Sequence, residues 1–190
     1  MVHANLALRD DVHRRPPRIA RKHPDADWPQ VWRNIGSKVL PQCVRDRWYE
    51  VVHCLVVTRA LLHERRVDRS LTSPDCPECG VRDDLEHRLT ECDDADAIWH
   101  WLQQRLSVLL GTLVQPAAML RPDFKAKDKA TQAAALWLTG NTVAYLARGG
   151  RVVADEFQRT IKREKQSVLN MPHIWPDELL NGLKTQIPYL

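Results

Sequence analysis

Hydrophobic residues recur along most of the chain with the spacing of helices that bury one face. Apolar positions lie three and four residues apart, with polar and charged positions between them, in four segments: 28–35, 44–56, 98–110 and 153–161. This repeat is typical of amphipathic helices. The segment 131–147, TQAAALWLTGNTVAYLA, is apolar on almost every side. It predicts the central helix of a bundle, and the whole pattern predicts an all-α fold.

Local signals indicate where the helices begin and end. Side chains suited to capping helix N-termini precede three helical segments. Asp25 or Asp27 precedes the segment 28–35, Thr58 precedes a shorter segment at 59–67, and Asp93 or Asp94 precedes the segment that contains 98–110. Gly111 is a natural stop for the helix that ends near residue 110, because glycine readily adopts the left-handed conformation of a C-terminal cap. Gly140 predicts a kink in the central helix.

These signals divide the chain into four parts. The first part is rich in arginine, proline and histidine and has little apolar periodicity, so we expect it to be mobile. The last part contains three prolines, which interrupt helices. We therefore expect a flexible basic and proline-rich arm at 1–27, a helical domain at 28–112, a C-terminal helical extension at 113–170 and an irregular tail at 171–190.

One short window within 74–93 carries residues with metal-ligand spacing. The window reads C-x2-C-x7-H-x4-C, and its four candidate ligands are Cys76, Cys79, His87 and Cys92. Three thiolates and an imidazole fill a tetrahedral zinc site and leave no position for water. Gly80, directly after the first pair, allows backbone amides to approach the sulfurs. The spacing therefore predicts one structural zinc ion that stabilises a small insert in the helical fold.

Composition and cysteine usage restrict the class of protein. The chain has 190 residues, 44% of them hydrophobic, which is enough for a folded body with its own core. It has neither the apolar run of roughly 18 residues that a membrane helix needs nor the apolar segment of a secretion signal. Clustered cysteines agree with a reducing compartment. We expect an intracellular protein without a membrane partner, located in the nucleus or in both nucleus and cytoplasm.

The net charge of +4 is unevenly distributed. Residues 76–104 contain eight acidic and two basic side chains, so the excess of positive charge lies on the flanking helices. A polyanion would meet those helices first. The candidates for phosphate contacts are Arg45, Arg47, Arg59, Arg65, Arg66, Arg69, Lys125, Lys127, Lys129, Lys162, Arg163 and Lys165. Taken singly, each charge is more commonly a solvated helix face, and the tryptophans are more commonly packing residues than stacking platforms.

Residues around the metal motif resemble a known family. Its members carry a Trp-bearing helix, a segment of the type W-Y-x-V-V-H-x-L-V-x-T-x-x-x-L-H, the C-x2-C-G and H-x4-C pairs, and a Trp-rich helix. The matching positions are Arg47, Trp48, Tyr49, Val51, Val52, His53, Leu55, Thr58, Leu62, His63, the metal motif, Ile98, Trp99 and Trp101. The chain is similar over residues 28–110 to the zinc-binding domain at the C-terminus of reverse transcriptases of non-LTR retrotransposons.

The resemblance implies a non-catalytic domain that binds RNA or DNA, or both, beside a polymerase during target-primed reverse transcription. A weaker likeness continues through 122–124 and 136–138, and the N-terminal arm matches nothing in the family. The chain contains no Y/F-x-D-D polymerase motif. We therefore expect a fragment or stand-alone remnant of such an element, without enzymatic activity of its own.

Two other functions fit parts of the sequence. A protein interaction module would use the acidic metal segment and exposed tryptophans to dock on a reverse transcriptase or a nucleoprotein. A restriction-like nuclease would use the Pro122-Asp123 pair, with Asp155, Glu156 and Lys162 as distant partners for magnesium. The nuclease is the weaker alternative because a Pro-Asp pair is more often a turn.

Overall fold

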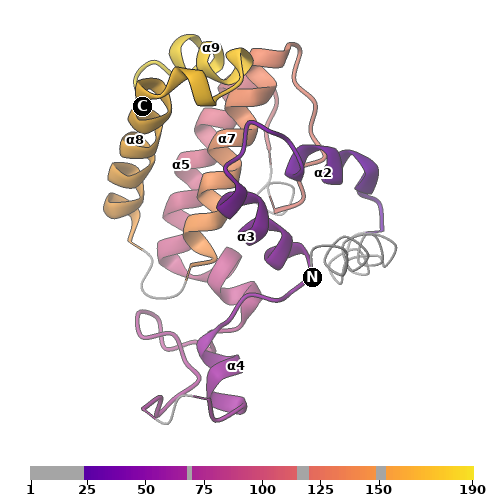
Figure 1. Ribbon diagram of the computed structural model, residues 1–190. Coiled ribbons are helices and arrows are strands. Elements are labelled where there is room, and N and C mark those ends of the chain that lie inside the picture. The colour runs from indigo at the N-terminus through magenta and orange to yellow at the C-terminus, as the bar shows by residue number, and fades with distance from the viewer. Residues whose placement is uncertain (1–23, 68–69, 115–119, 149–152) are drawn as a thin grey trace, which may run out of the picture.

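The computed structural model describes residues 24–67, 70–114, 120–148 and 153–190 (Figure 1). Within those residues the backbone forms helices and turns, and extended segments pair only at a single bridge between Asp75 and Arg82. The helices are α2 (Trp28–Ile35), α3 (Gln42–Val52), α4 (Arg59–Glu64), the π-helix η2 (His87–Glu91), α5 (Asp93–Leu110), α7 (Lys129–Leu146), α8 (Ala154–Asn170), the 3-10 helix η3 (Pro172–Ile174) and α9 (Asp177–Thr185). The predicted all-α fold is confirmed.

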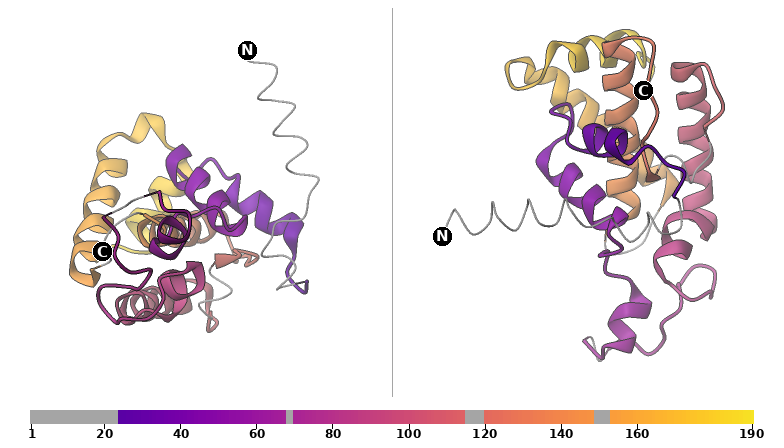
Figure 2. Two further views of the ribbon diagram at one scale, coloured as in Figure 1. Left: turned by 90° about the horizontal axis from the view of Figure 1, so that it is seen from below. Right: turned by 90° about the vertical axis from the view of Figure 1, so that its right-hand side faces the viewer.

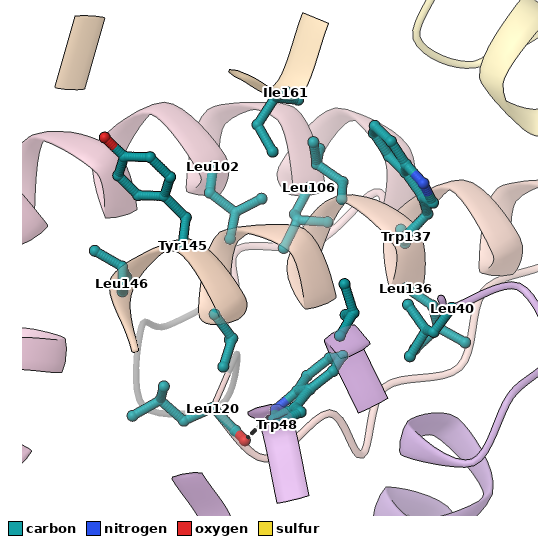
Figure 3. Packing of buried hydrophobic residues seen from close by; sticks show 14 of the residues in the cluster. Leu40, Trp48, Leu102, Leu106, Leu120, Leu136, Trp137, Tyr145, Leu146 and Ile161 are labelled. Carbon is teal, nitrogen blue, oxygen red and sulfur yellow. Dashed lines mark hydrogen bonds between the residues drawn. The ribbon is translucent and has the colours of Figure 1, made fainter. Parts of the chain in front are cut away.

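Helix α7 is the centre of the bundle. It packs against α3, α5, α8 and α9, which surround it in Figures 1 and 2. Most of its side chains are buried on every side, as its all-round apolar sequence predicts. Figure 3 shows Leu136, Trp137 and Leu146 of α7 among side chains from the neighbouring helices. This helix unites the elements before and after it into one core.

Two fully buried tryptophans add hydrogen bonds to the apolar packing of this core. Trp48 of α3 donates from its indole nitrogen to the carbonyl of Leu120 at 2.9 Å, which fixes the segment leading to α7 (Figure 3). Trp99 of α5 donates to the carbonyl of Leu89 in η2. Buried indole N–H groups need such acceptors, since an unpaired donor in the interior is costly.

Gly140 allows α3 and α7 to approach closely. A methyl group at this position would lie 2.8 Å from Leu40 Cδ2, 2.9 Å from Val44 Cγ1 and 3.1 Å from the ring of Trp48. Helix α7 continues without interruption through Gly140, and the kink expected there stays a prediction. The glycine serves packing between helices.

Most of the predicted helix boundaries agree with the structure. Asp27 caps α2 by accepting a hydrogen bond from the Gln30 amide at 3.0 Å, and Thr58 caps α4. Gly111 ends α5 with φ +67°. Helix α3, by contrast, ends at Val52, well before the end of the periodic segment 44–56.

The early end of α3 changes which side chains face the core. Cys54 adopts a left-handed φ of +54°, and the chain turns there. As a result Leu55, which helical spacing would place inside, is 53% exposed, while Val56 is buried. Hydrophobic spacing does not predict this turn, because cysteine rarely adopts a positive φ.

The expectation of an irregular tail at 171–190 is wrong. After η3, residues 177–185 form α9, whose Leu179 and Leu183 are fully buried. Gly182 lies against α7 so closely that a methyl group there would be 2.3 Å from the Ala130 carbonyl oxygen. Pro176 precedes the first turn of α9, where a proline costs no hydrogen bond. The prolines therefore separate two helices.

The structure also bears on the expected domain boundaries. Because α7 packs against both α3 and α5, a boundary between 112 and 113 would cut through a single core. Residues 1–23 of the predicted arm lie outside the described residues. No helix in the described part of the chain combines the length and the hydrophobicity that crossing a bilayer requires.

Candidate metal centre

The first two ligands lie on a tight turn after α4. The Cys76 amide donates to the Val81 carbonyl at 2.7 Å, and the Gly80 amide donates to the Cys76 carbonyl at 3.0 Å. Gly80 has φ +70°, as expected for the glycine that follows the C-x2-C pair. This turn directs the amides of Glu78 and Cys79 toward the Cys76 sulfur.

The second pair of ligands is brought together by a π-helical turn. The Cys92 amide donates to the His87 carbonyl at 2.9 Å, which is the i to i−5 bond of a π-helix. Residues five apart lie above one another in such a turn, whereas in an α-helix they point in different directions. The π-helical turn therefore places the His and the Cys of the H-x4-C pair close enough to bind the same ion.

Cys92 is also the N-cap of α5. Asp93 or Asp94 was the predicted cap, but both lie in the first turn of the helix. The Cys92 side chain makes no capping hydrogen bond, but the nearby backbone amides of Asp94 and Ala95 act to lower the pKa of its thiol. A thiolate at a helix N-terminus is favoured by the positive end of the helix dipole.

The four predicted ligands converge on one point. Their ligand atoms all lie within 4.8 Å of one another. The sulfurs of Cys76 and Cys92 are 4.0 Å apart, and the Cys79 sulfur is 3.1 Å from His87 Nε2. In a tetrahedron with Zn–S of about 2.3 Å and Zn–N of about 2.0 Å, the sulfur–sulfur edge is about 3.8 Å and the sulfur–nitrogen edge about 3.5 Å. The residues thus form a group of four side chains that could hold one metal ion.

The buried imidazole supports an ion at this point. His87 is 2% exposed, and its Nδ1 has no hydrogen-bond partner among the described residues. The other ring nitrogen, Nε2, lies 3.1 Å from the Cys79 sulfur and is the atom placed to bind an ion. The donor set of three sulfurs and one nitrogen is the set that zinc prefers.

The thiols differ in their acidity. Burial raises the pKa of Cys76, but hydrogen bonds from His87 and from the amides of Glu78 and Cys79 outweigh this effect and bring the pKa to about 7. Burial, together with the neighbouring Cys76 sulfur, raises the pKa of Cys92 to about 11. Two adjacent sulfurs resist carrying charge together, and a bound cation would relieve that repulsion.

A buried ion pair connects the metal centre to the core, and sequence reasoning missed it. Arg88, in η2 next to His87, pairs with Asp83, and both side chains are buried. Arg88 also donates to the carbonyl of Arg148, just beyond the end of α7, at 3.1 Å. The only signal in the sequence was the adjacency of Arg88 to a ligand, which does not reveal its burial.

Asp83 also anchors α4. It accepts a hydrogen bond from the Arg59 amide at 3.0 Å, and its carbonyl accepts one from the Ala60 amide at 3.2 Å. The Arg59 guanidinium donates to the Asp75 carbonyl at 3.0 Å. Helix α4 is therefore attached to both ends of the turn that carries Cys76 and Cys79.

The predicted phosphate contacts fall on separate surfaces. Arg65 and Arg66 lie exposed just beyond α4; Lys125, Lys127 and Lys129 lie exposed near the start of α7; Lys162 and Arg163 lie exposed on α8. Other candidates are engaged within the protein: Arg45 with Gln42, Arg47 with Glu50, and Arg59 with Asp75. Arg69 lies outside the described residues.

The prediction that Lys165 contacts phosphate is wrong. It is 7% exposed, and its ammonium donates to the carbonyls of Ile187 at 2.6 Å and Pro188 at 3.2 Å. Burial lowers the pKa of this ammonium group. Its role is to hold the C-terminal segment against α8, and it is not placed to contact phosphate.

The residues considered for a nuclease lie on different elements. Asp123 is in the segment before α7, and Asp155 and Glu156 are in the first turn of α8. The metal-binding group found among the described residues consists of Cys76, Cys79, His87 and Cys92 and includes none of these acids.

No protein-family model matches the chain, and neither a curated protein nor a solved structure is detectably similar to it.

Proposed function

We propose that this chain is a non-catalytic nucleic-acid-binding domain in which a structural zinc ion positions a short helix that leads into two arginines. The observation that carries the proposal is the attachment of α4 to the metal turn through Arg59, Asp75 and Asp83. Helix α4 has only six residues, which is too short to be stable alone. The metal centre would therefore decide how its C-terminal end is presented.

That end carries the side chains suited to phosphate. Arg65 and Arg66 follow the last turn of α4 and are exposed. Guanidinium groups bind phosphate oxygens through paired hydrogen bonds, and such contacts carry no sequence information. The resemblance to the zinc-binding domain of non-LTR retrotransposon reverse transcriptases supports RNA or DNA as the ligand.

The role of zinc is tested by metal content. We expect one zinc ion per chain by mass spectrometry of the purified protein, and loss of that ion in Cys79→Ser. Cys43→Ser is the matched control, because Cys43 is exposed on α3 outside the cluster. Retention of zinc by Cys79→Ser, or its loss from Cys43→Ser, would contradict the assignment.

Nucleic-acid binding is tested by salt dependence. Each phosphate contact contributes a slope of about −0.9 to a plot of log affinity against log salt concentration. We expect Arg65→Gln/Arg66→Gln to reduce the slope by about two for both RNA and DNA. The pair Arg159→Gln/Lys184→Gln, on α8 and α9, removes the same charge from exposed positions outside the predicted set and is the control. Equal losses in both variants would show diffuse attraction and reject the role of α4.

Docking to another protein is the second candidate function. Leu55 and Val57, in the link between α3 and α4, are 53% and 52% exposed, and Val81 in the metal turn is 51% exposed. Apolar side chains on the acidic segment suit a basic protein surface, such as that of a polymerase or a nucleoprotein. Affinity for nucleic acid without a salt slope, or no affinity at all, would favour this candidate.

A further inference from the structure

A cavity at the end of the bundle opposite the metal centre has the size of a small-ligand site. It lies between α2, the start of α7 and α9 (Figure 1), and its volume is about 450 Å³. Ligand pockets in proteins commonly measure about 300 to 1,000 Å³. The metal centre, by contrast, lies near the C-terminal end of α7, where Arg88 contacts Arg148.

Three lysines line this cavity from one stretch of chain. Lys125 and Lys127 precede α7, and Lys129 is its first residue. The residues between them, Ala126 and Asp128, line the same space, so the whole stretch 125–129 borders the cavity. Cations gathered around a concave site attract anions more strongly than the same charges spread over a surface.

Two amide side chains, the buried Asn34 and the half-buried Gln132, hold the lysine-bearing segment in place. Asn34 of α2 is 4% exposed and donates to the carbonyls of Pro122 at 2.6 Å and Phe124 at 3.1 Å. Gln132 of α7 accepts a hydrogen bond from the Ala126 amide at 2.6 Å. Because two helices bind the backbone on both sides of Lys125, the rim of the cavity is formed before any ligand arrives.

Two carboxylates also line the cavity, Asp128 and Glu178. Asp128 is the N-cap of α7, where it accepts hydrogen bonds from the Thr131 amide at 2.8 Å and the Thr131 hydroxyl at 2.7 Å. Asp27 lies 4.0 Å from Lys125, at the edge of ion-pair distance. Capping leaves the Asp128 carboxylate charged, so the three lysines that line the cavity exceed its two lining carboxylates by one charge.

We infer that this cavity binds a phosphate group, carried either by a free nucleotide or by the end of a nucleic-acid strand. The lysines would bind the phosphate oxygens, and Val39, Ala133 and Leu136 would provide an apolar wall for the attached base. The site is separate from Arg65 and Arg66 and does not depend on the function proposed for α4.

Titrations of the full chain with inorganic phosphate and adenosine monophosphate, followed by amide chemical shifts, test the inference. We expect saturable shifts at Ala126 and a loss of affinity of about tenfold or more in Lys125→Gln/Lys127→Gln/Lys129→Gln. Arg82→Gln/Arg159→Gln/Lys184→Gln removes the same charge from exposed positions that do not line the cavity and should change the affinity little. Equal losses in the two triple variants, or shifts that do not saturate, would overturn the inference.

A variant that fills the cavity without changing its charge distinguishes the contribution of the cavity from that of the lysines. Ser37 lines the space, and Ser37→Trp should block it and lower phosphate affinity about tenfold with the lysines intact. Unchanged affinity in a folded Ser37→Trp protein would reject the cavity as the site. Arg65→Gln/Arg66→Gln should bind phosphate like the unaltered chain, so failure of one proposal is distinguishable from failure of the other. Oligonucleotides with 5′-phosphate and 5′-hydroxyl ends then distinguish a strand end from a free nucleotide.

Discussion

The helical core and the metal segment are stabilised by different means. The core is filled by apolar side chains such as Trp48, Trp137 and Leu138, all of which are at most 1% exposed. The segment 70–92 contributes Leu89 and two of its cysteines to that interior, while its other residues are mainly polar. A region with so little apolar surface gains little from burial to offset its conformational entropy, and an ion bound by its four candidate ligands would supply further stabilisation.

The two regions meet at a polar junction. Arg88 joins Asp83 in the metal segment to the carbonyl of Arg148 beyond α7, and Cys92 is both a ligand and the cap of α5. A structural ion can thus orient α4 and α5 relative to the core. The following changes, from the largest expected effect to the smallest, test how independent the two regions are.

Removal of the metal should have the largest effect, confined to one region. Structural zinc supplies about 10 kcal/mol or more in small zinc-binding units. With a chelator, we expect amides between Cys76 and Cys92 to lose their protection from hydrogen exchange, while amides in α7 keep theirs. Simultaneous loss in α7 would show that the chain unfolds as one unit.

Trp48→Ala should destabilise the helical core and leave the metal segment able to bind its ion. It removes a fully buried ring and the hydrogen bond to Leu120, so we expect a loss of about 3–5 kcal/mol in the free energy of unfolding by urea. Zinc content should remain one ion per folded chain. A loss below about 1 kcal/mol would contradict the central position of this side chain.

Asp83→Ala tests the junction itself. The substitution leaves the buried guanidinium of Arg88 without its counter-charge, and we expect a loss of about 3 kcal/mol in the free energy of unfolding. In the double variant Asp83→Ala/Arg88→Met, much of that loss should be recovered because no buried charge remains. If the double variant is as unstable as the single one, the cost comes from the lost anchor of α4.

Gly140→Ala should have the smallest effect. Its methyl group would press on Leu40 and Val44, so we expect a loss of about 1–3 kcal/mol despite the better helix propensity of alanine. Gly111→Ala is the comparison, since nothing lies within 4 Å of the added methyl and only the φ of +67° opposes it. Stabilisation by Gly140→Ala would show that α3 can move away from α7.

The sequence alone determined the features that depend on local spacing. Hydrophobic periodicity predicts the helices and the central position of α7, and capping chemistry predicts Asp27 and Thr58. The four metal ligands follow from residue type and spacing, because a closed loop of a few residues can place them in few ways.

Only the tertiary structure decided the features that depend on distant contacts. The left-handed turn at Cys54, the formation of α9 on α7, the burial of Lys165 and the pairing of Arg88 with Asp83 all depend on partners far along the chain or on a backbone conformation that residue type disfavours. The cavity at Lys125, Lys127 and Lys129 likewise requires α2 and α9 as walls. Local patterns record which residues can be buried or charged, and packing determines which of them meet.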